Sequence, residues 1–261
     1  MKNVLLLSLF TIGIFTLSIA SENNTNSYSK ESRKFYTSLS AIPISLRIEG
    51  QVNATAVLIK TGTPSNNWLF LYHDRWGLTE TVVLEAHTLW KDLKNVNVLV
   101  IDLNDGIQPQ SQSEAMRILI DNDVERDRAI IQSAINYVGS NAKIGSLGWC
   151  NGGSWSLQTA IMAKHQEVAC VVYYGMPDFN SSKLAHIESD VLAIYGSQDT
   201  YITPTIALAF KSKMLLAGKK VISIHYDGKG NFADRNSIQY NFPKASDAYT
   251  KVLKYLLTKY H

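Results

Sequence analysis

Eight short runs rich in Val, Ile, Leu and Tyr recur along this chain, and they constrain its fold more than any other feature. The later runs are continuously apolar rather than alternating, which is typical of strands covered on both faces in a parallel sheet. The first two runs are joined by a short polar segment, residues 49–53, which predicts an antiparallel hairpin at one edge of the sheet. The expected strands are residues 42–48, 55–59, 68–72, 96–103, 142–147, 168–174, 191–195 and 221–226.

Helical patterns lie between most of these runs, so strands and helices alternate along the chain. Pro204 follows Thr203 and suits the first turn of one such helix, because its missing N–H is not needed there. The sequence has no internal repeat and no sign of a second domain. We therefore expect the α/β class, with a mostly parallel central sheet of about eight strands and helices on both faces. The expected helices are residues 79–93, 124–137, 154–165, 204–216 and 244–260.

The first 20 residues have the composition of a secretory signal peptide. Lys2 gives a basic start, residues 4–20 are nearly all apolar or hydroxylic, and small residues just before Ser21 predict cleavage there. The alternative is an uncleaved anchor, but the segment is short for a membrane span. We therefore expect an exported protein, periplasmic or secreted, with no stable membrane anchor after the signal is removed.

The remaining length suits a single domain, since α/β folds of this size often stay undivided. Residues 21–38 are polar for most of their length, and we expect them to form a flexible leader outside the core. The folded domain then extends over residues 39–261.

Charge and short motifs exclude several function classes. The formal net charge of +3 is small and no Lys/Arg cluster stands out, so nucleic-acid binding is not expected. There is no metal-binding cluster, dinucleotide fingerprint or phosphate-binding loop in the sequence, so no metal and no cofactor are implied. Of the two cysteines, Cys170 lies in an apolar run typical of an interior strand. An oxidising compartment would permit a disulfide between Cys150 and Cys170, and the sequence leaves their redox state open.

Residues 148–153, Gly-Trp-Cys-Asn-Gly-Gly, join an expected strand to an expected helix. A small-x-nucleophile-x-Gly pattern at such a turn is typical of a nucleophile elbow, where neighbouring Cβ atoms would clash. The free N–H groups at the start of the helix behind it could hold an oxyanion. Cys150 is therefore a candidate nucleophile, and the alternative is a buried cysteine in a glycine-rich turn.

Other motifs follow the ends of expected strands in the same way. They are residues 74–77, Asp199 and residues 227–232. Because ligands of two-sided α/β sheets bind at the carboxyl ends of the strands, we expect these motifs to meet around Cys150.

Several segments together resemble the dienelactone hydrolase family of α/β-hydrolases, from about residue 44 to the C-terminus. The elbow resembles the family's Gly-x-Cys-x-Gly-Gly, and the nucleophile, acid and base regions follow in α/β-hydrolase order. The other segments that carry the resemblance are residues 73–78 (His-Asp-Arg-Trp-Gly-Leu), 102–106 (Asp-Leu-Asn-Asp-Gly), 172–177 (Val-Tyr-Tyr-Gly-Met-Pro) and 194–199 (Ile-Tyr-Gly-Ser-Gln-Asp).

The resemblance implies an α/β-hydrolase fold and a role for each matching residue. It implies that Cys150 is the nucleophile, that Asp199 is the acid that orients a histidine, and that Asp74 lies beside the nucleophile where the family usually has Glu. The oxyanion hole would use the backbone N–H groups of Asn151 and Arg75. Asp74 and Asp199 could instead be simple turn residues, which Asp favours.

The resemblance fails at the catalytic base. The family has a pattern like Asp-x-x-His-Ala-Phe after the last strand, whereas this chain places Gly230 or Asn231 at the histidine position. Neither residue can take a proton. The base candidates that remain are His225, on the expected last strand, and His73, beside Asp74.

Two functions stay open from the sequence. The first is hydrolysis of small carboxylic esters or lactones by acyl transfer through Cys150, impaired by the missing histidine, because an unassisted thiol is only slightly ionised at neutral pH. The second is a catalytically inactive exported relative that binds a small ligand in the same pocket. The family binds a substrate carboxylate with arginines, and the candidates here are Arg75, Arg117 and Arg235.

Overall fold

The structure is a computed structural model of the chain, and it describes residues 30–260. The predicted signal peptide and the first part of the predicted leader lie outside the described residues. Over residues 30–260, no helix is both long enough and apolar enough to cross a membrane.

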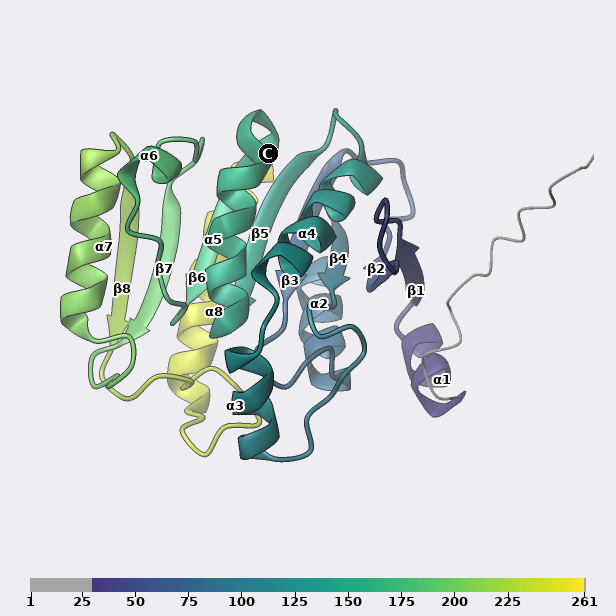
Figure 1. Cartoon of the computed structure of the whole chain (residues 1–261), viewed down its shortest axis with the longest axis horizontal. Helices are drawn as coiled ribbons and strands as arrows, with labels where there is room; N and C mark the ends of the chain where they lie inside the picture. Colours follow the sequence, from purple (N-terminus) through teal and green to yellow (C-terminus); the bar gives the residue numbers. More distant parts are fainter. Residues whose placement is uncertain (1–29, 261) are drawn as a thin grey trace, which may run out of the picture.

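One mixed sheet of eight strands organises the chain (Figure 1). Its order is β1-β2-β4-β3-β5-β6-β7-β8, and all neighbours from β4 to β8 are parallel. The hairpin of β1 and β2 lies at one edge as predicted, and β2 also pairs antiparallel with β4. The strands are β1 (Ala41–Leu46), β2 (Ala54–Ile59), β3 (Asn67–Tyr72), β4 (Asn97–Ile101), β5 (Lys143–Trp149), β6 (Glu167–Tyr173), β7 (Val191–Gly196) and β8 (Val221–Tyr226).

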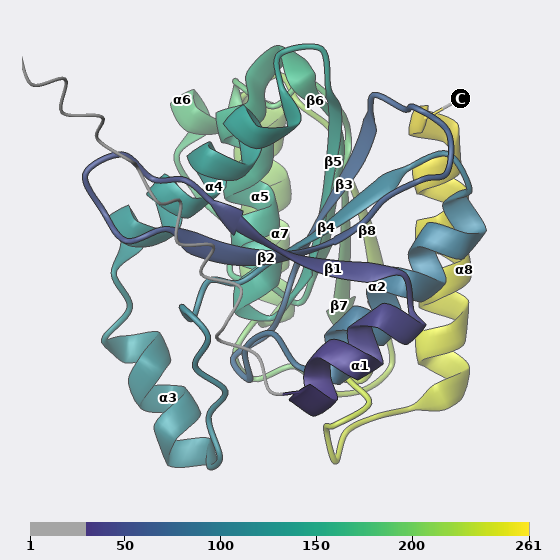
Figure 2. The same cartoon turned by 90° about the vertical axis from the view of Figure 1, so that its right-hand side faces the viewer.

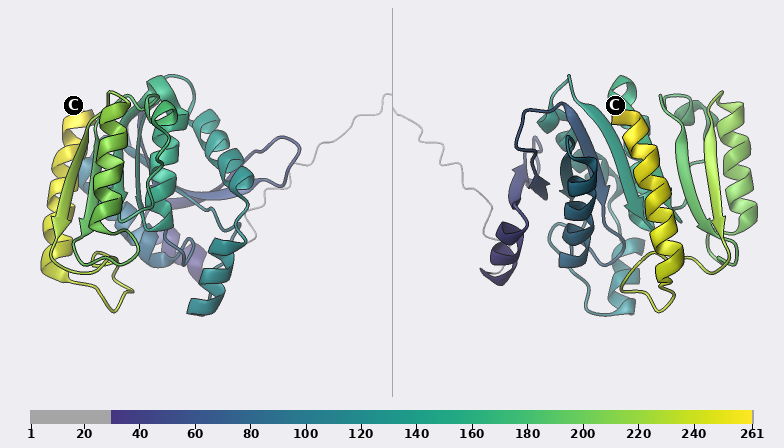
Figure 3. Two further views of the ribbon diagram at one scale, coloured as in Figure 1. Left: turned by 60° about the vertical axis from the view of Figure 1, so that its left-hand side comes forward. Right: turned by 180° about the vertical axis from the view of Figure 1, so that it is seen from behind.

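Helices cover both faces of the sheet, which confirms the predicted α/β class (Figures 2 and 3). On one face, α1, α2 and α8 enclose an apolar cluster, and on the other face α4, α5, α6 and α7 enclose two more. The helices are α1 (Lys30–Ser38), α2 (Glu80–Leu93), α3 (Gln112–Ile120), α4 (Val124–Val138), α5 (Asn151–Ala163), α6 (Ser181–Leu184), α7 (Pro204–Leu216) and α8 (Phe242–Tyr260).

The fold differs from expectation at α1 and α3. Residues 30–38, expected within the flexible leader, form α1, and Tyr36 is buried in the cluster under α2 and α8. Burial of this aromatic side chain holds the segment against the core, although most of its other residues are polar. Helix α3 has a capping serine, Ser111, whose hydroxyl accepts the Glu114 N–H at 3.2 Å. The helix was not predicted because most of its apolar side chains, Ile120 included, are not buried and leave no core-facing stripe.

Both cysteines are free thiols, so no disulfide joins them. Cys170 is fully buried on β6, as the apolar run predicted, with its sulfur 3.7 Å from the Ser156 hydroxyl. Cys150 stands between β5 and α5 and is half-buried.

Candidate active site

The turn from β5 to α5 has the backbone of a nucleophile elbow. Cys150 has φ 54° and ψ −120°, a conformation that a residue with a side chain rarely adopts. Its N–H donates to the Tyr173 carbonyl at 3.0 Å, and its own carbonyl accepts the Gly153 N–H at 3.0 Å. The turn is therefore held on both sides by the backbone, and the thiol stands at the carboxyl edge of the sheet.

The elbow glycines are required by close backbone approach. A Cβ on Gly148 would overlap the Gly152 carbonyl, and a Cβ on Gly152 would overlap the carbonyl of His73 at the end of β3. A Cβ on Gly153 would lie only 2.9 Å from the Tyr173 carbonyl oxygen. The small residues that the sequence placed around Cys150 therefore let the turn fit between β3 and β6.

The Cys150 thiol is predominantly protonated at neutral pH. Burial raises its pKa above the ordinary value, and the charges of Asp74 and Asp199 raise it further. The backbone N–H of Asn151, which hydrogen-bonds the sulfur, and the charge of Arg75 act in the opposite direction. The Asn151 N–H thus lies at the thiol, the Arg75 charge favours the thiolate, and two carboxyls oppose its ionisation.

Asp74 is held in the turn that follows β3. Its Oδ1 accepts the Trp76 N–H at 2.9 Å, so it does serve the turn. Burial raises the pKa of its carboxyl to about 6, and the charge of Asp234 also raises it, whereas His73 and Arg75 lower it. A carboxyl with this pKa exchanges its proton close to neutral pH, which a simple turn residue does not need.

Asp199 uses its two oxygens differently. Oδ1 accepts the N–H groups of Tyr201 and Ile202 at 2.7 and 3.0 Å, so it caps the loop after β7. Oδ2 has no hydrogen-bond partner among residues 30–260, and it faces Gly230. Both interpretations of Asp199 therefore fit the structure, because one oxygen serves the loop and the other points to the position expected for the base.

The loop after β8 lies directly against the Asp199 carboxylate. A Cβ on Gly230 would overlap Oδ2 and would lie 2.9 Å from Cγ. The next residue, Asn231, has φ 59°, and its carbonyl accepts the Asp234 N–H at 3.2 Å in a tight turn. No side chain from Gly230 or Asn231 supplies an ionisable group beside Asp199.

His73 ties two strand ends together. Its Nδ1 lies 2.6 Å from the Asp74 carbonyl oxygen, and its Nε2 lies 3.0 Å from the Leu103 nitrogen and 3.5 Å from Asp102 Oδ1. Burial lowers the pKa of His73, but the hydrogen bond and charge of Asp102 outweigh it and raise that pKa. Both ring nitrogens are therefore occupied, and neither is free to take a proton from Cys150.

His225 is exposed on β8 and turned away from the elbow. Its ring centre lies 5.5 Å from that of Tyr195, which belongs to the apolar cluster under α7. Cys150 packs against the cluster on the other face, under α2 and α8. The sheet thus separates His225 from the thiol.

Well over half of the chain, residues 93–260, matches the sequence model of the dienelactone hydrolase family. The chain belongs to the dienelactone hydrolase family. The matched region includes the elbow, the Asp199 loop and the loop after β8, whereas His73, Asp74 and Arg75 lie before it.

Solved structures give the same fold for this family member. It superposes on a dienelactone hydrolase-like promiscuous phosphotriesterase from metagenomic libraries with a TM-score of 0.72, at 14% identity, covering 84% of this chain and 98% of that one. A Klebsiella pneumoniae protein assigned as a dienelactone hydrolase superposes with a TM-score of 0.71 at 15% identity, covering 84% of this chain and 99% of that one. The dienelactone hydrolase of Anabaena variabilis superposes with a TM-score of 0.58 at 18% identity, covering 85% of this chain and 98% of that one. A search of curated protein sequences gives no match.

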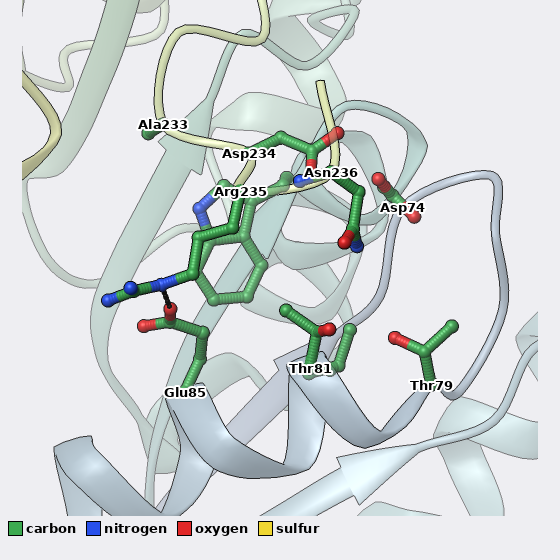
Figure 4. Close-up of a pocket in the computed structure, with 10 residues that line it drawn as sticks. Asp74, Thr79, Thr81, Glu85, Ala233, Asp234, Arg235 and Asn236 are labelled. Carbon is green, nitrogen blue, oxygen red and sulfur yellow. Dashed lines mark hydrogen bonds and ion pairs between the residues drawn. The ribbon is translucent and has the colours of Figure 1, made fainter. Parts of the chain in front are cut away.

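In this dienelactone hydrolase family member, a small cavity of about 40 Å³ adjoins the elbow (Figure 4). A second cavity, of about 140 Å³, shares four of its lining residues, and the ion pair of Arg235 and Glu85, at 2.5 Å, stands in the shared wall. The first cavity is lined by Asp74, Thr79, Thr81, Val82, Glu85, Trp149, Ala233, Asp234, Arg235 and Asn236.

Of the three arginines considered for a substrate carboxylate, only Arg75 is both near the thiol and free of an acidic partner within the described residues. Its guanidinium lies 5.4 Å from the centre of the Trp76 ring, and its Nε is buried without a hydrogen-bond partner there. Arg235 is already paired with Glu85, and Arg117 is exposed on α3.

Sequence reasoning missed two residues of the site, Asp234 and Tyr174. Asp234 lines the cavity beside Asp74, and Tyr174, directly after β6, is buried with its hydroxyl unpartnered over residues 30–260. An Asp in a polar loop carries no motif, and residues 172–177 resemble the family without assigning a role to Tyr174, so only tertiary contacts reveal the two residues. The described residues contain no group of three His, Cys, Asp or Glu side chains that could hold a metal ion.

Proposed function

We propose that this protein hydrolyses small carboxylic esters or lactones by acyl transfer through Cys150. The observation that supports this most is the strained backbone of Cys150, whose φ of 54° lifts the thiol above the sheet. The Asn151 N–H on its sulfur supports one of the two predicted oxyanion donors, and the Arg75 charge favours the thiolate. A buried structural cysteine would need none of these features.

The reaction would proceed through a thioester. As the Cys150 sulfur attacks the carbonyl carbon, its proton passes to the carboxylate of Asp74, and the backbone N–H groups of Asn151 and Arg75 hold the oxyanion. The alkoxide leaves with that proton. Water then attacks the thioester, giving its proton to Asp74, which returns it to sulfur as the acid departs.

The turnover would be slow. The pKa of the Cys150 thiol is raised above its ordinary value, whereas that of Asp74 is about 6, so proton transfer from sulfur to carboxylate is uphill. Gly230 lies where Asp199 could have oriented an imidazole. Loss of one member of such a unit lowers the rate by several orders of magnitude in well-studied hydrolases.

The same observation at Gly230 favours a second candidate function. The loop after β8 occupies the space next to Oδ2 of Asp199, so an inactive relative could keep the pocket for a small ligand. This alternative needs the cavity beside Asp74 and Asp234 but not the nucleophile.

Hydrolysis of p-nitrophenyl acetate and of a small lactone by the mature protein tests the proposal. We expect slow turnover that is lost in Cys150→Ala and kept in Cys170→Ala, a matched control at the buried thiol. Turnover that survives Cys150→Ala would refute the mechanism.

Two further variants separate the alternatives. Asn231→His is the cleaner restoration of the base, because φ of 59° suits His better than most residues, whereas Gly230→His must displace Asp199. If the parent is inactive and either variant hydrolyses the ester, the protein is a hydrolase fold without its base, and the ligand-binding function stands.

We also propose that the protein is exported to the periplasm or beyond after cleavage before Ser21. The support is the composition of residues 1–20 alone. N-terminal sequencing of the protein from fractionated cells tests this, and a cytoplasmic protein that begins at Met1 would refute it.

A further inference from the structure

Asp74 and Asp234 come from opposite ends of the sequence and meet in the cavity beside the elbow. Asp74 follows β3, Asp234 belongs to the loop after β8, and both line the same hollow (Figure 4). Their carboxyl groups lie beside each other there, and an interaction of Asp74 with Asp234 lowers the pKa of Asp234 against the effect of its burial. Two ionised carboxylates have no proton to share, so a hydrogen bond between them forms only in the state in which the pair carries one proton.

Backbone contacts leave one oxygen of each carboxyl available for this contact. Oδ1 of Asp74 accepts the Trp76 N–H at 2.9 Å, and Oδ1 of Asp234 accepts the Asn236 N–H at 2.8 Å. Each carboxyl is thus fixed by its own turn. The second oxygens remain for the shared proton.

Tyr174 provides an independent indication that this corner of the site meets a ligand. Its side chain is only 4% exposed, and its hydroxyl has no hydrogen-bond partner among residues 30–260. Burial raises the pKa of Tyr174 far above the ordinary value, and the charges of Asp234, Tyr173, Asp74 and Cys150 add to this. An unpaired buried hydroxyl is costly, which fits a group that pairs with a substrate oxygen or a water molecule.

The charges around the pair are mixed. Arg75 and His73 lower the pKa of Asp74, and Arg75 also lowers that of Asp234. Burial, the largest influence on both, raises them, and across the cavity the ion pair of Glu85 and Arg235 is neutral overall. On the thiol side, Cys150 is faced by Asp74, Arg75 and Asp199.

We propose that Asp234 is a further functional residue of this site, which holds one proton jointly with Asp74 and so supplies the acid–base chemistry that no histidine provides. This inference rests on the proposed hydrolysis through Cys150. Asp74 exchanges the proton with sulfur, alkoxide and water, and Asp234 acts through Asp74 as a positioning residue. Tyr174 donates its hydroxyl hydrogen to the substrate oxygen or to the attacking water.

The proton balance closes over one turnover. At the start of the cycle both carboxyls are ionised. The pair accepts the thiol proton as the carbon–sulfur bond forms, holds it jointly, and gives it to the alkoxide as the ester carbon–oxygen bond breaks. It then accepts a proton from water as the new carbon–oxygen bond forms and returns it to sulfur as the thioester breaks. The products are one acid and one alcohol, and the pair ends as it began.

A titration followed by NMR of ¹³C-labelled aspartate carboxyls in the mature protein tests the pair without relying on turnover. We expect a carboxyl that titrates near pH 6, with the signals of Asp74 and Asp234 both responding to the same proton. In Asp234→Asn the midpoint of Asp74 should fall, because the like charge is gone. An unchanged midpoint, or no aspartate titrating above the ordinary range, would overturn the inference. Asp121→Asn, at an exposed acid that ends helix α3, is the matched control and should leave the midpoint in place.

The pH profile of kcat/KM for p-nitrophenyl acetate supplies the second reading. We expect the acidic limb of the profile to follow the NMR midpoint of Asp74 and to move to lower pH in Asp234→Asn. In the same variant, kcat should fall about tenfold at neutral pH. Tyr174→Phe should lower kcat, and the NMR midpoint of Asp74 should stay above the ordinary range of aspartate. A shared proton in NMR with no turnover would refute the hydrolysis but leave the pair standing. Turnover with an acidic limb unaffected by Asp234→Asn would refute the pair alone.

Discussion

The two sides of the candidate site are built on different principles. On the elbow side, backbone packs against backbone, and Gly148 and Gly152 are the residues that allow it. On the opposite side, the loop after β8 has turns but no helix or strand before α8. Its backbone packs against Gly196, but it meets the acids of the site through Gly230, which faces the Asp199 carboxylate, and through the Asp234 side chain. A turn fixed by backbone packing keeps its geometry whatever chemistry follows, whereas a loop can lose a catalytic side chain and close over its place.

The largest effect is expected from Gly148→Ala in the elbow. The new Cβ overlaps the Gly152 carbonyl, which cannot move without moving α5. We expect the free energy of unfolding to fall by roughly 4 kcal/mol or more, measured by urea denaturation. Gly62→Ala is the matched control, because nothing lies within 4 Å of its Cβ position, and it should change stability by less than about 0.5 kcal/mol. Equal effects of the two variants would refute the claim that the elbow is held by backbone packing.

His73→Ala extends the comparison to the strand ends beneath the elbow. The substitution leaves the buried Leu103 N–H without its acceptor and the Asp102 carboxylate without one of its neighbours. We expect a loss of about 2 to 3 kcal/mol in thermal or urea unfolding. His225→Ala, at an exposed position on β8, should alter neither stability nor ester turnover. A stable His73→Ala variant that loses turnover would instead return His73 to the list of bases.

Gly230→Ala measures how firmly the loop side is packed. Its Cβ meets a carboxylate rather than backbone, but Asp199 is held by the N–H groups of Tyr201 and Ile202. We expect a loss of about 1 to 2 kcal/mol, well below that of Gly148→Ala. In a double-mutant cycle with Asp199→Ser, which shortens the obstructing group, most of this loss should disappear. Full additivity would mean that the Gly230 contact is not the cause.

The smallest effect concerns pH. The folded-state pKa of Asp74, about 6, exceeds the ordinary 3.8, so the folded protein holds this proton more tightly than the unfolded chain. Its contribution therefore favours folding below about pH 4 and is lost as the pH rises through about 6. Asp74→Asn should raise the free energy of unfolding by about 1 kcal/mol at pH 8 and change it little at pH 4. Urea denaturation at both values checks this, and a uniform effect would contradict it.

Much of the fold was predictable because strand burial and helix start signals are local. The predicted bounds of α7 and β8 match the structure, and α7 begins at Pro204 after the capping hydroxyl of Thr203. The start of α5 was placed at Ser154, three residues late, because Asn151 and two glycines do not resemble a helix. Helix α1 was missed because its stability comes from burial of Tyr36 against distant residues.

The site was predictable only where backbone geometry demands particular residues. The glycines around Cys150 revealed the elbow, whose backbone the structure shows. The pairing of Asp74 with Asp234 depends on how a loop of no regular structure folds back over the sheet. The second role of Asp199, capping its own loop, likewise depends on the positions of the Tyr201 and Ile202 N–H groups, which the sequence does not specify.

That second role has an evolutionary consequence. Because Oδ1 of Asp199 holds the loop after β7, selection for a folded protein preserves this aspartate even in a lineage that has stopped hydrolysing anything. A histidine at position 230 would have no such structural role, and it can be substituted as soon as turnover is no longer under selection. Among descendants of one ancestral hydrolase, the acid is therefore a poor marker of retained catalysis, and the residue facing its other oxygen is the informative one.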